Sequence, residues 1–314
     1  MHRGIHAGFA TLALLLVVTL VVLWPRPEDG GVQPPLPPPS SGLPPPVGPP
    51  PSLPTSSDPG TPCVPTPTQR LRVATFNIHG GVGAAGYDLP GIADEIRAWD
   101  ADVVLLQEVH RFRAKSGLDD QPAALGRLLG MDVVFGRNFS RPAESDGAPS
   151  RESGTATLSS LPILSWSNQL LPNFPGLQQR GLLRATIDLP GGPVDVFNTH
   201  FQHTRGVIRI VQARGVKRLV AADAGRPFLL GGDFNAESGS PAMRVIDSFT
   251  SDPWPQVGVG SGLTVPPRVP RRRIDFVLYG SDGWVPEQAQ VLTSRIADHR
   301  AVLVDYALPR RAAC

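Results

Sequence analysis

The chain has 314 residues, of which 36 are proline, and its formal net charge is only +2. With 41% hydrophobic residues it can bury a sizeable core, whereas the small net charge excludes a basic field over the whole surface as the basis of binding to nucleic acid. The only two cysteines, Cys63 and Cys314, exclude a zinc site built from several thiolates.

The chain begins with an apolar segment, residues 1–24. His2, Arg3 and His6 precede an uncharged run from Gly8 to Trp24, which is about as short as a membrane span can be and slightly long for a signal-peptide core. Residues 1–24 are therefore predicted to be a signal peptide or a membrane anchor, and Trp24 favours the anchor. We expect either a single-pass protein of the cell membrane with its folded domain outside, or a secreted protein.

A proline-rich segment follows at residues 25–69 and holds 18 of the 36 prolines. It has almost no periodic apolar pattern, so it is predicted to be an extended linker. Cys63 near its end and Cys314 at the last residue flank the remaining chain. In an oxidising compartment they could pair, or they could be two unrelated thiols; two positions do not decide between these.

Residues 70–314 are predicted to form one α/β domain. In chain order, the apolar patterns predict a strand at 71–77 with a Gly-rich turn to 81, a helix at 88–100, a strand at 101–109, a helix at 120–130, a strand at 131–137, a loop at 138–153, strands at 155–160, 182–189 and 193–200, a helix at 206–223, a strand at 227–234, a helix at 240–249, and strands at 273–280, 289–294 and 301–308.

Two features indicate the arrangement of these strands. The short connection Pro190-Gly191-Gly192 predicts a hairpin, so the sheet is not purely parallel. Four consecutive apolar residues within 101–109 are typical of a strand covered on both faces. The predicted fold is α/β with two mixed sheets packed together and helices outside. In the helix at 206–223, Val207 and Val216 are expected to face the core, while Arg209 and Gln212 are expected on a solvated face.

Six of the predicted apolar strands share one property: each has a polar group of ligand or acid/base type at or near one end. These residues are Asn77, Glu108, His200, Asp233, Asn235, Asp275, Asp298 and His299. One such residue is usually a turn former, but so many together indicate a site. Asp233 and Asn235, two residues apart, are expected on one strand face. Gly231 and Gly232 before them either leave room for close approach or form a bulge.

These residue types indicate a particular chemistry. Carboxylate and amide oxygens without a dense histidine set suit Mg²⁺ or Mn²⁺. Two histidines, His200 and His299, accompany them, and Asp275 could orient one by accepting a ring N–H. A metal, two histidines and a carboxylate–amide pair predict a site for hydrolysis of phosphoester bonds.

Six segments occur in an order that resembles a known superfamily: "TFNIHGG", "LLQEVHR", "FNTHFQH", "GGDFNA", "RRIDFVL" and "ADHRAV". Across about residues 71–306 the chain resembles the endonuclease/exonuclease/phosphatase superfamily, which includes pancreatic-type deoxyribonucleases, abasic-site endonucleases, inositol polyphosphate 5-phosphatases and neutral sphingomyelinases. The resemblance implies a four-layer α/β sandwich in residues 70–314, with the site where strand ends of both sheets meet.

The resemblance also implies roles for single residues. Asn77 and Glu108 correspond to a metal-site pair, with Asp298 as a further metal-side carboxylate. Asp233 and Asn235 correspond to the pair that positions the attacking water and a phosphate oxygen. His299 corresponds to the phosphate-contacting histidine, Asp275 to its orienting partner, and His200 to the second, acid-side histidine.

Four more residues are expected near the substrate: Arg180, Arg111, Arg273 and His79. His79 stands where some nucleases of the superfamily carry aspartate, which leaves one carboxylate fewer for a metal. It is expected to be either a phosphate contact or a turn residue. Arg273 is partly explained by the superfamily pattern of its segment.

The predicted function is metal-dependent hydrolysis of phosphoester bonds by a protein with a monomeric catalytic domain. A nuclease would use Arg111, Arg113 and the basic run 268–273 on nucleic acid, and its activity would fall with salt. A sphingomyelinase-like enzyme or a lipid or inositol phosphate phosphatase would instead act on a phospholipid headgroup or related phosphoester, and would suit a membrane tether. A binding module that kept the fold without catalysis is the third alternative.

Overall fold

The structure, a computed structural model, describes residues 69–143, 145–223, 225–280 and 283–308. The predicted leader, all but the last residue of the predicted linker, and both cysteines lie outside the described residues. Among the helices of the described ranges, none has the length and apolar character needed to cross a membrane.

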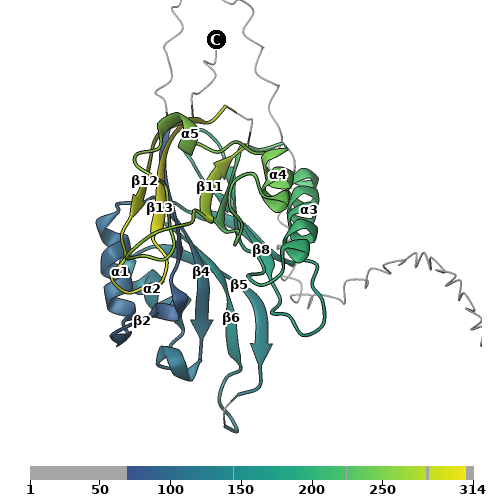
Figure 1. Cartoon of the computed structure of the whole chain (residues 1–314). Coiled ribbons are helices and arrows are strands. Elements are labelled where there is room, and N and C mark those ends of the chain that lie inside the picture. Colours follow the sequence, from purple (N-terminus) through teal and green to yellow (C-terminus); the bar gives the residue numbers. More distant parts are fainter. Residues whose placement is uncertain (1–68, 144, 224, 281–282, 309–314) are drawn as a thin grey trace, which may run out of the picture. The chain divides into compact units, whose positions relative to one another are not determined.

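Two large mixed sheets form the centre of the domain (Figure 1). The six-stranded sheet has the order β12 (Val285–Leu292), β13 (Ala301–Leu308), β1 (Gln69–Asn77), β4 (Val103–Arg111), β6 (Arg151–Ser159) and β5 (Asp132–Arg141). The five-stranded sheet has the order β11 (Asp275–Tyr279), β10 (Phe228–Asp233), β9 (Val194–His200), β8 (Gly181–Ile187) and β7 (Ile163–Leu170). A small ribbon pairs β2 (Val82–Gly83) with β3 (Gly86–Tyr87).

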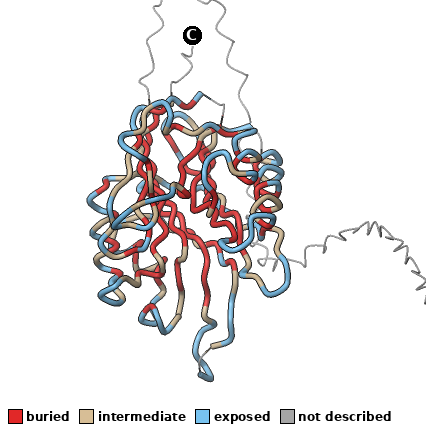
Figure 2. Tube along the Cα trace, in the orientation of Figure 1, coloured by how far each residue is buried: buried red, intermediate tan, exposed pale blue. Residues whose placement is uncertain are grey.

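The sheets pack face to face because their strands are apolar on both faces. In β4, Leu105 points between the sheets and packs with residues such as Val196 and Leu229, whereas Leu106 lies in a separate cluster on the outer face. Figure 2 shows the resulting band of buried chain through the centre of the domain. The predicted two-sided burial of this strand is confirmed, as is the hairpin of β8 and β9, which pair antiparallel from Ile187 and Val194.

Helices cover both outer faces and complete the four layers. The helices α1 (Leu89–Ala98) and α2 (Gln121–Leu129) pack on the six-stranded sheet, while α3 (Gly206–Ala222) and α4 (Pro241–Asp247) pack on the five-stranded sheet. Short helical turns occur at η1 (His79–Gly81), η2 (Ala114–Ser116) and α5 (Trp254–Val257). Side chains of Asp88, Asp120 and Ser240 accept backbone N–H groups at the starts of α1, α2 and α4. The predicted α/β sandwich is confirmed.

Three local predictions were wrong. The expected loop at 138–153 contains the ends of β5 and β6, which pair from Arg141 and Arg151 and are polar because they reach solvent. The edge strand β7 was missed because its large apolar residues, including Trp166, are exposed and give no core signal. Val207, expected in the core, is 70% exposed at the start of α3.

Strand register gathers the polar strand ends at one place. Asp233 lies beside His200 of the parallel strand β9 and beside Asp275 of the antiparallel strand β11. Pairing through Gly231 and Gly232 is continuous on both sides, so there is no bulge. A Cβ at Gly231 would lie 2.6 Å from Leu105 Cδ1 of the facing sheet, so this glycine serves close packing of the two sheets.

Candidate active site

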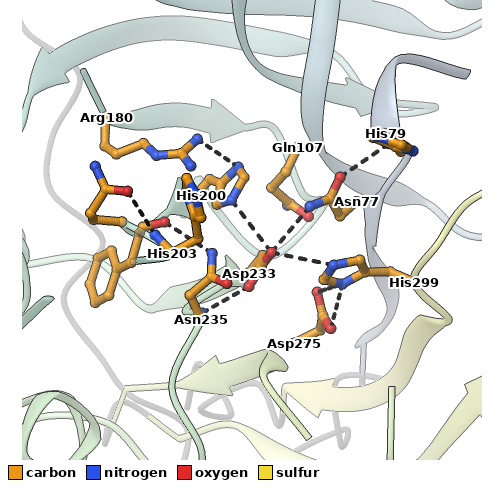
Figure 3. A network of polar contacts seen from close by, with 12 residues as sticks. Asn77, His79, Gln107, Arg180, His200, His203, Asp233, Asn235, Asp275 and His299 are labelled. Atoms are coloured by element: carbon orange, nitrogen blue, oxygen red, sulfur yellow. Dashed lines mark hydrogen bonds and ion pairs between the residues drawn. The ribbon is translucent and has the colours of Figure 1, made fainter. Parts of the chain in front are cut away.

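Asp233, at the end of β10, is the centre of the candidate site (Figure 3). Asn77 Nδ2 donates a hydrogen bond to Asp233 Oδ2 at 3.1 Å, so the site joins the ends of strands from both sheets. The Nε2 atoms of His200 and His299 lie 3.4 and 3.7 Å from the same oxygen. The structure therefore brings together the amide, the carboxylate and the two histidines that the sequence predicts.

Asn235 was expected to lie on the same strand face as Asp233, but it reaches the site through a turn. Strand β10 ends at Asp233, and Asn235 has a φ of 48°. Its backbone N–H donates to Asp233 Oδ1 at 2.8 Å, and its Nδ2 donates to the carbonyl of Phe201 at 3.1 Å. Aspartate followed by a left-handed asparagine thus forms a local turn that fixes the Asp233 carboxylate.

Asp275 and His299 form a buried pair on the far side of Asp233. His299 Nδ1 lies 3.0 and 2.9 Å from the two carboxylate oxygens of Asp275. Burial disfavours the imidazolium, but the charge and hydrogen bond of Asp275 and the charge of Asp233 outweigh it and raise the pKa of His299 to about 10. His299 is therefore protonated at neutral pH, with Nδ1–H on Asp275 and Nε2–H directed toward Asp233.

Asp233 has the environment of a general base. Burial, and after it the negative charge of Asp275, raises the pKa of Asp233 to about 7, against opposing effects of His299 and of the hydrogen bonds from Asn235 and Asn77. A carboxylate with a pKa near neutrality can accept a proton from water and release it again at physiological pH. The cluster of buried charges is thus suited to proton transfer.

Arg180, at the start of β8, fixes the state of His200. Its Nη1 lies 3.0 Å from His200 Nδ1, and both side chains are buried. Arginine can only donate, so Nδ1 accepts and the proton of the neutral ring must be on Nε2, which faces Asp233. Burial first, and then the charge of Arg180, lowers the pKa of His200 well below its usual value. His200 is therefore a neutral N–H donor.

The expected metal-site pair lies beside this cluster. Asn77 Oδ1 accepts the backbone N–H of His79 at 3.1 Å. Glu108 lies where the β4–β6 register shifts, between Leu106 and Val109, and has a φ of 54°. Such a φ is uncommon for glutamate, and a bulge with strain is frequent where a strand directs a side chain into a site. The charge of Glu108 acts on Arg180, the partner of His200.

Asp298 and His79 lie close to each other near Asn77. Their side chains approach to 3.9 Å between His79 Nδ1 and Asp298 Oδ2, and both are partly exposed. They line a cavity of about 710 Å³ together with Arg268 and Arg300. His79 is a turn residue with a φ of 49°, and it also lines this cavity.

The available oxygens fit a divalent cation. Among the described residues nothing hydrogen-bonds or ion-pairs with the Glu108 carboxylate, and Glu108 directly follows Gln107, which is paired with Asn77 in the sheet. Carboxylate and amide oxygens are ligands that Mg²⁺ prefers. A second possible group is Asp233, Asp275 and His299, whose candidate ligand atoms lie within 4.8 Å of one another. Their approach is already explained by the Asp275–His299 hydrogen bonds, so we favour Asn77, Glu108 and Asp298 as the metal side.

Two arginines expected near the substrate are not brought to this cluster. Arg111 pairs with Asp120 at 2.8 Å and with Glu152 at 2.9 Å. Arg273 makes two hydrogen bonds of 2.7 Å to Asp252 and lies against the rings of Trp254 and Phe276. Because these guanidinium groups have protein partners, they stabilise the fold around the site.

Sequence reasoning missed two supporting glutamines. Gln107 is buried between the sheets, and its Nε2 donates to Asn198 Oδ1 at 2.9 Å, which joins β4 to β9 next to the site. Gln212 is also buried, contrary to the predicted solvated face, and its Oε1 accepts the backbone N–H of Gln202 in the segment after His200. A polar residue within a strongly apolar strand was the available signal for Gln107.

Comparisons with known proteins agree with this arrangement. Residues 74–299 match the sequence profile of the Endonuclease/Exonuclease/phosphatase family. The uncharacterized protein YbhP of Escherichia coli (strain K12) is 30% identical over 189 residues, which are 55% of this chain and 70% of YbhP.

Solved structures extend the likeness. That of an endonuclease/exonuclease/phosphatase from Beutenbergia cavernae DSM 12333 is 30% identical, with a TM-score of 0.61 over 76% of this chain and 72% of the other. A mannosyl-6-phosphatase of Bacteroides thetaiotaomicron VPI-5482 is 18% identical, with a TM-score of 0.61 over 75% of this chain and 99% of the other. The human Nocturnin catalytic domain with bound sulfate is 19% identical, with a TM-score of 0.59 over 76% and 93%. These last two share the fold.

Proposed function

Since the chain belongs to the endonuclease/exonuclease/phosphatase family, whose members are divalent-metal-dependent hydrolases of phosphoester bonds, we propose that it is a Mg²⁺- or Mn²⁺-dependent phosphodiesterase that acts on nucleic acid. One observation carries the proposal. A buried carboxylate with a pKa near neutrality, Asp233, lies between a neutral histidine and a protonated one. That set provides a base for water and two N–H donors for a phosphate.

The chemistry assigned to these groups is a simple displacement. Water attacks the phosphorus atom and gives a proton to the carboxylate of Asp233, while the bond from phosphorus to the ester oxygen breaks and the leaving oxygen takes a proton from solvent. The Nε2–H groups of His200 and His299 donate to phosphate oxygens, where negative charge increases. Asp275 keeps His299 protonated and oriented, because it accepts the hydrogen bond of Nδ1.

A divalent cation bound by Asn77, Glu108 and Asp298 would supply charge neutralisation at the phosphate. The protein contributes the position of these oxygens, through the end of β1, the bulge in β4 and the segment before β13. His79 links Asn77 to Asp298, because its backbone N–H donates to Asn77 Oδ1 and its ring lies near the Asp298 carboxylate.

The test of this function is a comparison of substrates with the full-length chain. Plasmid DNA, RNA, phosphoinositides and sphingomyelin are incubated separately with Mg²⁺ and with Mn²⁺. We expect cleavage of nucleic acid, with a rate that falls steeply as salt concentration rises, since phosphate contacts release counterions. Turnover of the lipids alone would reject nucleic acid as the substrate, and no turnover on any substrate would favour a non-catalytic binding module.

A second candidate function is hydrolysis of a phosphoester on an amphiphile. A cavity of about 850 Å³ is lined by Phe174, Leu177, Val207 and Ile208, and two of these residues, Phe174 and Val207, are 47% and 70% exposed. Exposed apolar side chains around one cavity suit an acyl chain. The predicted membrane anchor at residues 1–24 would bring lipids within reach. The phosphoinositide and sphingomyelin reactions of the same comparison test this candidate.

Arg180 provides a prediction about pH dependence. Replacing it with methionine removes the donor to His200 Nδ1 and one of the charges that lower the pKa of His200. We expect kcat/KM to fall about 10- to 100-fold, as is common when the partner of a site histidine is lost. The acid limb of the pH–rate profile, which reports ionisation of the base Asp233, should move to higher pH, because the positive charge of Arg180 that favours the ionised carboxylate is lost.

The matched variant is Arg180→Lys, which keeps a positive donor. It should retain more activity than Arg180→Met and an acid limb close to that of the wild type, as measured by kcat/KM from about pH 4 to 9. If Arg180→Met kept the wild-type kcat/KM, the proposed positioning of His200 by Arg180 would be wrong.

A further inference from the structure

A second cavity is lined in part by Glu108. It has a volume of about 640 Å³, and its lining includes Arg113, Lys115, Phe139 and Arg141. Arg113 and Lys115 belong to the segment that follows β4, and Phe139 and Arg141 belong to the end of β5, in the hairpin that extends beyond the sheets in Figure 1. Because Glu108 is also part of the lining, the cavity adjoins the candidate metal side.

Three cations and one carboxylate thus line this cavity. Arg113 and Arg141 lie over the same ring, that of Phe139, with guanidinium carbons 5.6 and 5.9 Å from its centre. Among the described residues, Arg113, Lys115 and Arg141 have no ion pair with a carboxylate. The neighbouring arginines differ, since Arg111 and Arg137 both pair with Glu152.

The clustered positive charges lower the pKa of neighbouring groups, although the charge of Glu108 opposes this effect. Burial first, and then the positive charge of Arg141, lowers the pKa of Arg113. Burial lowers the pKa of Lys115 as well, and Arg113 adds to that lowering against the opposing charge of Glu108. Like charges held together in this way create a local positive potential, which an anion would relieve.

We propose that the cavity formed by Arg113, Lys115, Phe139 and Arg141 binds a second phosphate group of the substrate, adjacent to the phosphoester that is hydrolysed. This proposal presupposes the hydrolytic function proposed above. Phosphate is favoured over a stacked base because the two guanidinium groups already lie over the Phe139 ring. Guanidinium groups bind phosphate with paired, charge-assisted hydrogen bonds, and lysine adds a point charge.

The experiment compares substrates that differ by one phosphate. The full-length chain with Mg²⁺ is given the thymidine dinucleotide TpT, its 5′-phosphorylated form pTpT and its 3′-phosphorylated form TpTp. We expect kcat/KM to be at least about 10-fold higher for one phosphorylated form than for TpT, as one charge-assisted contact allows. In Arg113→Ala and Arg141→Ala the ratio should fall toward one.

Arg137→Ala is the matched control. It removes an arginine from the same strand as Arg141, but one that is paired with Glu152, and it should leave the ratio as in the wild type. Equal turnover of all three dinucleotides by the wild type would overturn the second-phosphate site while leaving the hydrolytic function intact. A ratio that persists in both alanine variants would also overturn it.

Binding without catalysis separates the two proposals. Calorimetry with inorganic pyrophosphate and chelator-treated protein should show salt-sensitive binding that Arg113→Ala and Arg141→Ala lose, and absence of binding to the wild type would count against the site. If bis(p-nitrophenyl) phosphate and all dinucleotides are not hydrolysed while this binding occurs, the proposed phosphodiesterase activity on nucleic acid fails and the site stands. Inositol 1-phosphate and inositol 1,4-bisphosphate are tested in parallel as competitors of pyrophosphate binding. Stronger competition by the bisphosphate would indicate an inositol phosphate as the source of the second phosphate, and equal competition by the two would indicate a nucleotide.

Discussion

Replacing Asp233 with asparagine is expected to lower kcat by about 10³-fold, within the range for loss of a general base. The amide has nearly the same shape and can still accept the backbone N–H of Asn235, so the turn after β10 should persist. It cannot take a proton from water. Because Asp233 is buried beside the like charge of Asp275, removing its charge should change the melting temperature by only a few degrees.

Asp195→Asn is the matched control on the neighbouring strand. Asp195 is buried at the start of β9, while the site lies at the other end of that strand, and it pairs with Arg184 and Arg226 at 3.2 Å. Its replacement removes the buried carboxylate that pairs with the partly buried Arg184 and the exposed Arg226, so it should reduce the free energy of unfolding by about 1 to 3 kcal/mol and leave kcat nearly unchanged. Both variants are measured by steady-state turnover and by thermal unfolding. A fully active Asp233→Asn would remove Asp233 from the role of base.

Chelation of divalent metal is expected to abolish turnover, and added Mg²⁺ or Mn²⁺ should restore it. Glu108→Gln should raise the Mg²⁺ concentration needed for half-maximal activity about 10- to 100-fold, the range reported for altered metal sites. The reason is that Glu108 has a carboxylate without any other described partner and directly follows Gln107, the strand partner of Asn77. Activity is titrated against Mg²⁺ concentration for the wild type and the variant.

Glu152→Gln is the corresponding control. Glu152 is a mostly buried carboxylate on the adjacent strand β6, and it forms ion pairs with Arg111 and Arg137. It should lower stability and leave the Mg²⁺ titration in place. Activity that persists in chelator, or a Glu108→Gln titration identical to that of the wild type, would contradict the assignment of the metal side.

The sequence predicted the strand ends of the site well because apolar strands and polar ends are local patterns. Asn77, His200, Asp233 and His299 could be placed together before their contacts were known. The pairing of strands cannot be derived from such patterns. Asp275 lies directly beside Asp233 because β10 and β11 pair antiparallel in this register. Partners far apart in the chain, such as Arg180 and His200, depend on such pairing.

The differences from the sequence predictions have a common physical cause. Arg111 and Arg273 are expected near the substrate, but their guanidinium groups pair with Glu152 and Asp252, which lie 41 and 21 residues away in the chain. The face of Asn235 was inferred from a strand period that ends at Asp233. The loop expected at 138–153 was read from composition, which does not distinguish an exposed hairpin from an irregular segment.

The bulge that carries Glu108 has a consequence for protein engineering. A left-handed conformation disfavours glutamate by about 1 kcal/mol relative to glycine, and asparagine tolerates it better than most residues. Substitution of Glu108 by glycine or asparagine should therefore make the folded chain more resistant to heat while removing a ligand that the reaction needs. Selection for thermostability alone would drive this position away from glutamate, so a screen of this chain has to score turnover alongside heat resistance.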